Sequence, residues 1–143
     1  MGAMYDLDRF IKAQEQAYEQ ALSEIRSGHK RSHWIWYIFP QIKGLGFSFT
    51  SEYYGIDGLG EARAYMENPI LRKRLLEISE ALLDLPSSDA GEVMGHPDDL
   101  KLRSSMTIFA EASPEYSVFQ KVLDKFFDGD RDNKTLEARC FWR

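Results

Sequence analysis

Residues 29–41 read HKRSHWIWYIFPQ, so a cluster of positive charge runs directly into two tryptophans, a tyrosine and a phenylalanine. The apolar segment from Trp34 to Phe39 is too short for its periodicity to separate a strand from a helix. Ser32 can act as an N-cap, and Phe39 must leave helical geometry because Pro40 follows it. We therefore predict a short helix within this stretch.

A long helix is predicted immediately before the aromatic stretch. From Leu7 onwards, apolar residues recur at the spacing of one helix face, with Phe10 and Ile25 near its two ends. Asp6 can cap the start of this helix, and Gly28 can close its end.

Further helix signals follow the aromatic stretch. Asn68 and Pro69 supply an N-cap and a proline at the first helical position, where the missing N–H costs nothing. No strand alternation extends far, and no internal repeat is present. We expect a turn capped by Thr50 or Ser51 through Tyr53 and Tyr54, and helices from Gly60 to Glu67, from Pro69 to before Pro86, from Ser88 or Asp89 to Gly95, from Pro97, from Pro114 to Gly129, and near Thr135.

The pattern as a whole predicts an all-α fold, a single compact multihelical domain of about six to eight helices. The hydrophobic fraction of 43% in 143 residues is typical of a packed core. We assign residues 4–143 to this domain and interpret residues 1–3 as a remnant of cloning. Phe141 and Trp142 are expected to pack against the domain.

Composition argues against several classes of function. The net charge of −5 does not favour general duplex-DNA binding, which requires a basic surface that releases counterions. Cys140 is the only cysteine, so neither an intramolecular disulfide nor a thiolate metal cluster can form. No apolar run approaches the length of a membrane-spanning helix, and no signal peptide is recognisable. We expect a cytoplasmic protein without a membrane partner; the oligomeric state stays open.

The basic and aromatic residues of the 29–41 stretch allow two interpretations. Trp34 and Trp36 can be core residues, because large aromatic side chains supply much of the burial in a small domain. Alternatively, Lys30, Arg31 and His33 form a ligand site beside this segment, in which arginine and lysine bind a phosphate while a tryptophan face stacks on a base. Gln41, at the end of the stretch, is a further candidate ligand residue.

A metal site is not predicted. His29 and His33 lie four residues apart, as helical metal ligands can, but the expected cap at Ser32 interrupts a continuous helix through both. No paired carboxylate stands at a suitable spacing. We therefore expect neither a metal nor a cofactor.

Two other segments carry candidate chemistry. SEYY at 51–54 contains Glu52, which can complement a helix dipole or, if partly buried, activate water, with Tyr54 beside it. DDLKLRSSMTIF at 98–109 combines an apolar stripe with a polar one. Its polar residues can pair within the helix or form an anion clamp, for which the candidates are Lys101, Arg103, Ser104 and Ser105.

These segments carry a resemblance to a known family. KRSHWIWYIFPQIKGLG at 30–46, EARAYMENPILRKRL at 61–75 and DDLKLRSSMTIF at 98–109 resemble the bacterial domain-of-unknown-function 1810 family. Members are sometimes labelled calpastatin, a name that fits poorly because calpastatin is a disordered inhibitor. The order of motifs is also similar, more distantly, to the NADAR superfamily of YbiA-like proteins, which are mostly helical and cleave N-glycosidic bonds in ribosylated compounds.

The NADAR resemblance implies a fold, a ligand class and catalytic residues. It implies a YbiA-like helical domain, with the catalytic glutamate at Glu52 and a loosely matched lysine at Lys101. The ligand would be a nucleotide or a ribose-phosphate compound, held by cations and aromatic rings. Three hypotheses stay open: an N-glycosidase, a non-catalytic module that binds a nucleotide or a protein, and a helical domain whose motifs serve only packing.

Overall fold

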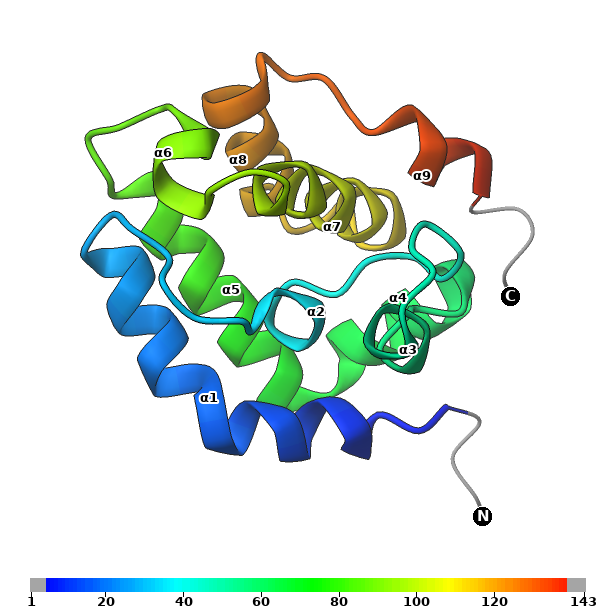
Figure 1. Cartoon of the computed structure of the whole chain (residues 1–143). Coiled ribbons are helices and arrows are strands. Elements are labelled where there is room, and N and C mark those ends of the chain that lie inside the picture. Colours follow the sequence, from blue (N-terminus) through cyan, green and yellow to red (C-terminus); the bar gives the residue numbers. More distant parts are fainter. Residues whose placement is uncertain (1–4, 139–143) are drawn as a thin grey trace.

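The all-α prediction is confirmed. The computed structural model describes residues 5–138, and among these residues it contains helices and one isolated parallel bridge between Ile42 and Ile56 but no strand (Figure 1). Nine helices occur in this range, because the predicted turn at 50–54 is itself a short helix. The helices are α1 (Asp8–Arg26), α2 (Ile35–Ile38), α3 (Phe49–Tyr53), α4 (Gly58–Glu67), α5 (Pro69–Leu83), α6 (Ala90–Met94), α7 (Asp98–Ala112), α8 (Val118–Phe127) and α9 (Asn133–Ala138).

Helix α7 is the centre of the fold. It packs against α2, α4, α6, α8 and α9, while α5 joins α8 to α1 on the other side of the core (Figure 1). All residues from Ser104 to Ala110 are buried, so this part of the helix is surrounded on every side rather than amphipathic. The sequence predicted a polar stripe that included Ser104. Its side chain is instead buried and hydrogen-bonded, and so is that of Thr107.

Helix ends agree with the sequence where a local cap sets them. The Asn68 side chain accepts hydrogen bonds from the backbone of Ile70 and Leu71, and Asp89 caps α6 in the same way. Five predicted starts are wrong. Helix α4 begins at Gly58 and not at Gly60. The other four concern α1, α2, α3 and α8. Asp6 makes no cap at α1, Trp34 rather than Ser32 precedes α2, Ser48 caps α3, and α8 begins after Ser117 because a turn occupies residues 113–116.

A buried carboxylate connects α1 to the aromatic stretch. Glu24 is only 3% exposed, and its Oε1 accepts hydrogen bonds from the backbone N–H of Arg31 at 2.7 Å and of Ser32 at 3.0 Å. The indole N–H of Trp34 donates to the same oxygen at 3.0 Å. Oε2 accepts from the hydroxyl of Ser32 at 2.7 Å and the amide of Gln20 at 3.1 Å. Ser32 therefore serves this carboxylate and not α2.

The hydrogen bonds determine the charge state of Glu24. Burial by itself raises the pKa of this carboxyl group, because it penalises the ionised form. The hydrogen bonds from Ser32, Arg31 and Trp34 outweigh that effect and lower the pKa from its ordinary value of 4.5 to about 2. The ionised carboxylate is thus the form that holds residues 31–34.

A buried ion pair, which contains a second buried carboxylate, connects α1 to α4 and to the segment before it. Arg9 lies 2.8 Å from Glu61, and the two side chains are 9% and 3% exposed. The guanidinium group of Arg9 also donates to the backbone carbonyls of Tyr53 and Gly55, and Glu61 accepts from the N–H of Asp57. The chain that leads from α3 into α4 is therefore fixed against α1.

Two further predictions concern membrane-spanning helices and the packing of the last residues. No helix in residues 5–138 combines the length and apolar character needed to cross a membrane. The predicted packing of Phe141 and Trp142, together with Cys140, lies outside the described residues.

We predict that Glu24→Gln lowers the free energy of unfolding at pH 7 by about 2–4 kcal/mol, because an amide cannot accept from all these donors at once. In the wild type, the lowered pKa of Glu24 contributes about 3 kcal/mol, fully present above pH 4.5 and lost as the pH falls towards 2. Urea denaturation as a function of pH measures both quantities.

The matched control is Glu19→Gln, which removes an exposed carboxylate from the same helix. We expect it to leave stability and its pH dependence nearly unchanged. Equal stability of the Glu24 and Glu19 variants at pH 7 would show that the buried carboxylate is not an anchor.

Candidate functional site

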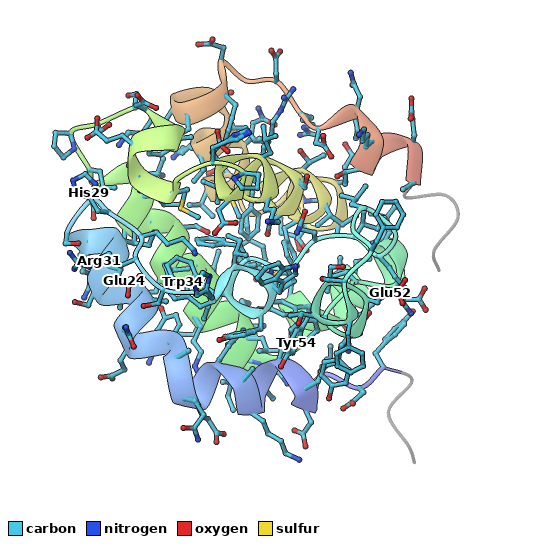
Figure 2. All side chains as sticks on the ribbon, in the orientation of Figure 1. Glu24, His29, Arg31, Trp34, Glu52 and Tyr54 are labelled. Carbon is cyan, nitrogen blue, oxygen red and sulfur yellow. The ribbon has the colours of Figure 1, made fainter. Side chains whose placement is uncertain are left out.

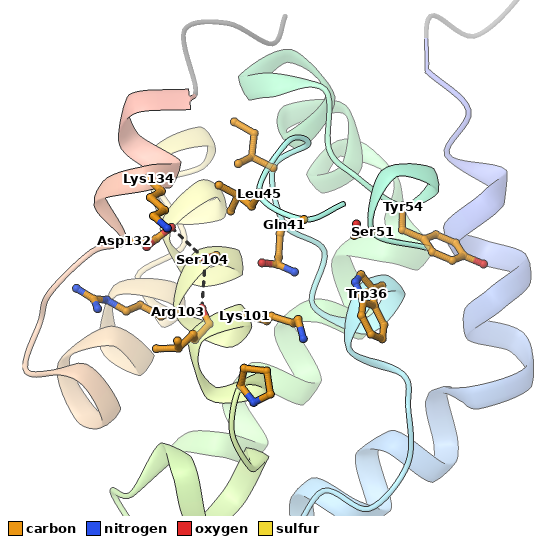
Figure 3. Close-up of a pocket in the computed structure, with 14 residues that line it drawn as sticks. Trp36, Gln41, Leu45, Ser51, Tyr54, Lys101, Arg103, Ser104, Asp132 and Lys134 are labelled. Carbon is orange, nitrogen blue, oxygen red and sulfur yellow. Dashed lines mark hydrogen bonds between the residues drawn. The ribbon is translucent and has the colours of Figure 1, made fainter. Parts of the chain in front are cut away.

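A cavity of about 400 Å³ lies between the start of α7 and the segment that joins α2 to α4 (Figure 3). Apolar groups from Ile42, Leu45 and Leu100 form part of its wall. Its polar and aromatic lining includes six predicted ligand residues. These are Trp36, Gln41, Tyr54, Lys101, Arg103 and Ser104.

The wall opposite α7 is held by the Ile42–Ile56 bridge. The backbone N–H of Lys43 donates to the carbonyl of Ile56, and the N–H of Ile56 donates to the carbonyl of Gln41, both at 2.8 Å. A Cβ atom on Gly55 would lie 2.9 Å from the Cα of Lys43. Glycine is therefore needed at position 55 for the two segments of the wall to approach each other.

Lys101 and Trp36 form the polar and aromatic centre of the site. The Lys101 ammonium group lies 4.9 Å from the centre of the Trp36 ring and 3.1 Å from the Asp98 carboxylate. The Trp36 indole nitrogen has no hydrogen-bond partner among the described residues. In Figure 3 the side chains of Gln41 and Lys101 both point into the space between α7 and the opposite wall. A cation, an amide and an aromatic ring thus meet in one cavity.

Arg103 has a structural role at the edge of the cavity. Its guanidinium group donates to the backbone carbonyls of Asp130 and Arg131, each at 3.1 Å. In Figure 3 this group points away from Gln41 and Trp36. Arg103 therefore fixes the chain that leads to α9 and exposes only part of its side chain to the cavity.

Ser104 connects the cavity to α9. Its hydroxyl lies 3.0 Å from Oδ2 of Asp132 and 3.1 Å from the Leu100 carbonyl. The same Asp132 oxygen accepts from the backbone N–H of Thr135 at 3.1 Å and its hydroxyl at 2.5 Å. Asp132 thus caps α9 while it lines the cavity.

Sequence reasoning missed Asp132 and Lys134, which both line the cavity. The spacing of Asp132 and Thr135 is that of an N-cap and the third helical residue. This spacing signalled the helix start. It gave no indication that the cap would face Ser104, because that contact joins segments far apart in the chain.

The other residues predicted from the 29–41 stretch do not line this cavity. Trp34 is 1% exposed and donates its indole N–H to Glu24, so no base can stack on it in this conformation. Arg31 and His33 are exposed on another part of the surface. Ser105 is fully buried in α7, and its hydroxyl has no partner among the described residues.

Glu52 also lies apart from the cavity. It is exposed and lines a separate shallow depression beside Arg9 and Lys43. In Figure 2 its carboxylate points outward, far from Trp34 and on the opposite side of the view from Arg31. The structure does not bring Glu52 and Lys101 into one site.

Burial also affects the tyrosine of the cavity. Desolvation raises the pKa of Tyr54, and the neighbouring Tyr53 and Tyr37 raise it further. The ring lies 5.2 Å from Tyr37 and 6.0 Å from Phe10, between centroids. Tyr54 is therefore neutral at physiological pH and provides a fixed, mainly apolar part of the wall.

Comparisons with known proteins give a family and one solved structure. A family model described as "Protein of unknown function (DUF1810)" matches residues 4–138. The crystal structure of the conserved hypothetical protein Rv1873 from Mycobacterium tuberculosis is 40% identical, with a TM-score of 0.94 over 96% of this chain and 99% of that one. No curated protein matches. The resemblance to the NADAR superfamily receives no support from these comparisons and stays a prediction.

We predict that Gly55→Ala lowers the free energy of unfolding by about 1–3 kcal/mol, because the added methyl group forces Lys43 and the wall of the cavity apart. Gly91→Ala is the control, since its methyl group would meet only the side chain of Asp89, the N-cap of α6, at 3.3 Å. Urea denaturation at pH 7 compares the two variants. Equal stability would mean that the wall tolerates a wider separation.

Proposed function

This chain belongs to the DUF1810 family of proteins of unknown function, as its motifs predicted, and we propose that its cavity binds a small phosphorylated ligand with a planar ring. The ligand class is a nucleotide or a ribose-phosphate derivative. The observation that best supports this proposal is that the Lys101 ammonium group lies 4.9 Å from the centre of the Trp36 ring, in a cavity of about 400 Å³. Ammonium groups bind phosphate, and indole faces stack on planar rings.

The charge of the cavity supports an anionic ligand. The ammonium groups of Lys101 and Lys134 line it with a single carboxylate, Asp132, although the whole protein carries a net charge of −5. The side chain of Lys134 has no ion pair with another described residue. A local excess of positive charge on an acidic protein attracts an anion to this one place.

The polar residues favour a ligand with a hydrogen-bonding ring. Gln41 offers both a donor and an acceptor beside the Trp36 ring, and Ser51 adds a hydroxyl to the same wall. Apolar groups of Ile42 and Leu45 complete this side. The combination of an apolar wall with a few polar groups is typical of small-molecule sites.

The geometry favours binding without turnover over the N-glycosidase hypothesis. The carboxylate expected to act in that reaction, Glu52, is exposed outside the cavity. Asp132 is the carboxylate inside the cavity, and one of its oxygens already accepts from Ser104 and Thr135. A binding module is therefore the function that the site supports best.

We predict that the wild-type protein binds ADP in isothermal titration calorimetry and that Lys101→Met weakens this binding by about tenfold, because the variant loses the charge next to the ring. Lys121→Met is the control, since it removes an exposed positive charge from α8, away from the cavity. Equal affinity of the Lys101 and Lys121 variants for ADP would contradict the proposed site.

Replacement of the Trp36 ring tests separately how the base and the phosphate of the ligand are bound. We expect Trp36→Leu to weaken ADP binding by about tenfold, since stacking contributes roughly 1–3 kcal/mol per base. Binding of ribose 5-phosphate, which has no base, should change by less than about threefold. A parallel loss for both ligands would show that Trp36 supports the cavity and does not stack on the base.

A further inference from the structure

Two lysines from different parts of the chain hold one carboxylate beside the cavity. Asp98 is the first residue of α7, and its Oδ1 lies 3.1 Å from the Lys101 ammonium group. Its other oxygen, Oδ2, lies 2.7 Å from the ammonium group of Lys30. We call this arrangement, Lys30–Asp98–Lys101, the lysine–aspartate–lysine chain.

Lys30 is firmly held at the inner end of this chain. Its side chain is only 5% exposed, and its ammonium group also donates to the backbone carbonyl of Ser32. The same group lies 4.8 Å from the Trp34 ring, and the Lys30 backbone N–H donates to the carbonyl of Val93 at 2.7 Å. Each lysine of the chain therefore faces one of the two tryptophans of the aromatic stretch.

Lys30 does not line the cavity, whereas Lys101 does. Loss of Lys30 therefore removes no direct contact with a bound ligand. Any effect of Lys30 on binding must act through its charge, through Asp98 or through the stability of the fold.

We propose that Lys30 is a charge-compensating residue, which neutralises Asp98 so that the positive charge of Lys101 acts on the anion in the cavity. This inference rests on the proposed function. The three side chains of the lysine–aspartate–lysine chain together carry one net positive charge. Without Lys30, Asp98 and Lys101 would form a neutral pair, and the attraction for an anion would fall.

The charge state of Asp98 agrees with this role. Burial raises the pKa of its carboxyl group, but hydrogen bonds from Lys30 and Lys101 outweigh burial and hold the pKa below its usual value. Asp98 is therefore ionised at neutral pH and competes with a bound anion for Lys101. In a partly buried site such charges act over several ångströms with little screening.

Charge counting gives opposite predictions for the two single variants. With ADP as the probe in calorimetry, we expect Lys30→Met to weaken binding by about tenfold and Asp98→Asn to strengthen it by a similar factor. The double variant restores one net positive charge, so its affinity should return to within about threefold of the wild type. Lys30→Arg keeps the charge and should bind nearly as the wild type does.

Asp99→Asn is the matched control for Asp98→Asn. Asp99 occupies the same first turn of α7 but pairs with His96 and contacts neither lysine of the chain. We expect its ADP affinity to change by less than about twofold. Thermal unfolding shows whether each variant is folded. If Lys30→Met does not fold, the ADP affinity of Asp98→Asn alone tests the proposal.

The outcomes separate this inference from the proposed function. If ADP binds the wild type and Lys101→Met weakens binding, but Lys30→Met has no effect or Asp98→Asn weakens binding, only the role of Lys30 is overturned. If the wild type binds no ADP, or Lys101→Met binds as tightly as the wild type, the proposed function falls and the inference falls with it.

Discussion

The rest of the structure depends on the hydrogen bonds that the buried carboxylate of Glu24 accepts. It accepts the backbone N–H groups of Arg31 and Ser32 and the indole N–H of Trp34 inside the protein, where water cannot replace it. These hydrogen bonds fix residues 31–34, at the charged start of the aromatic stretch, between α1 and α2. Glu24 thus connects the basic part of the stretch, through the backbone of Arg31 and Ser32, to the aromatic part, through the ring of Trp34.

The candidate site follows from this junction and from a second one. Arg9 and Glu61 fix the chain before α4, so the wall between the two anchors is held against α7. Trp36 comes from the first anchored segment and Lys101 from the buried central helix, which places a ring beside a charge. The position of this wall is thus a consequence of how two buried carboxylates are satisfied, and Lys101 and Lys134 supply the positive charge of the cavity.

Local signals in the sequence predicted the helices and part of the site. Asn68 and Asp89 marked helix starts because a cap needs only neighbouring residues. Glu24 gave no such signal, since a glutamate on an amphipathic helix ordinarily faces water and its partners lie beyond the helix. Trp34 and Trp36 could not be told apart, because residues two apart near a helix start point to different sides. The rest of the site depends on contacts between segments far apart in the sequence, such as that of Ser104 with Asp132. Local patterns do not reveal such contacts.

The central claim is that Glu24 is an ionised, hydrogen-bonded anchor within the folded protein. Its most direct test is a pH titration of the Glu24 side-chain carboxyl carbon by ¹³C NMR. The account predicts that this signal keeps its ionised chemical shift down to about pH 3 and titrates with a pKa of about 2. A transition centred near the ordinary value of 4.5, in a protein that is still folded, would contradict it.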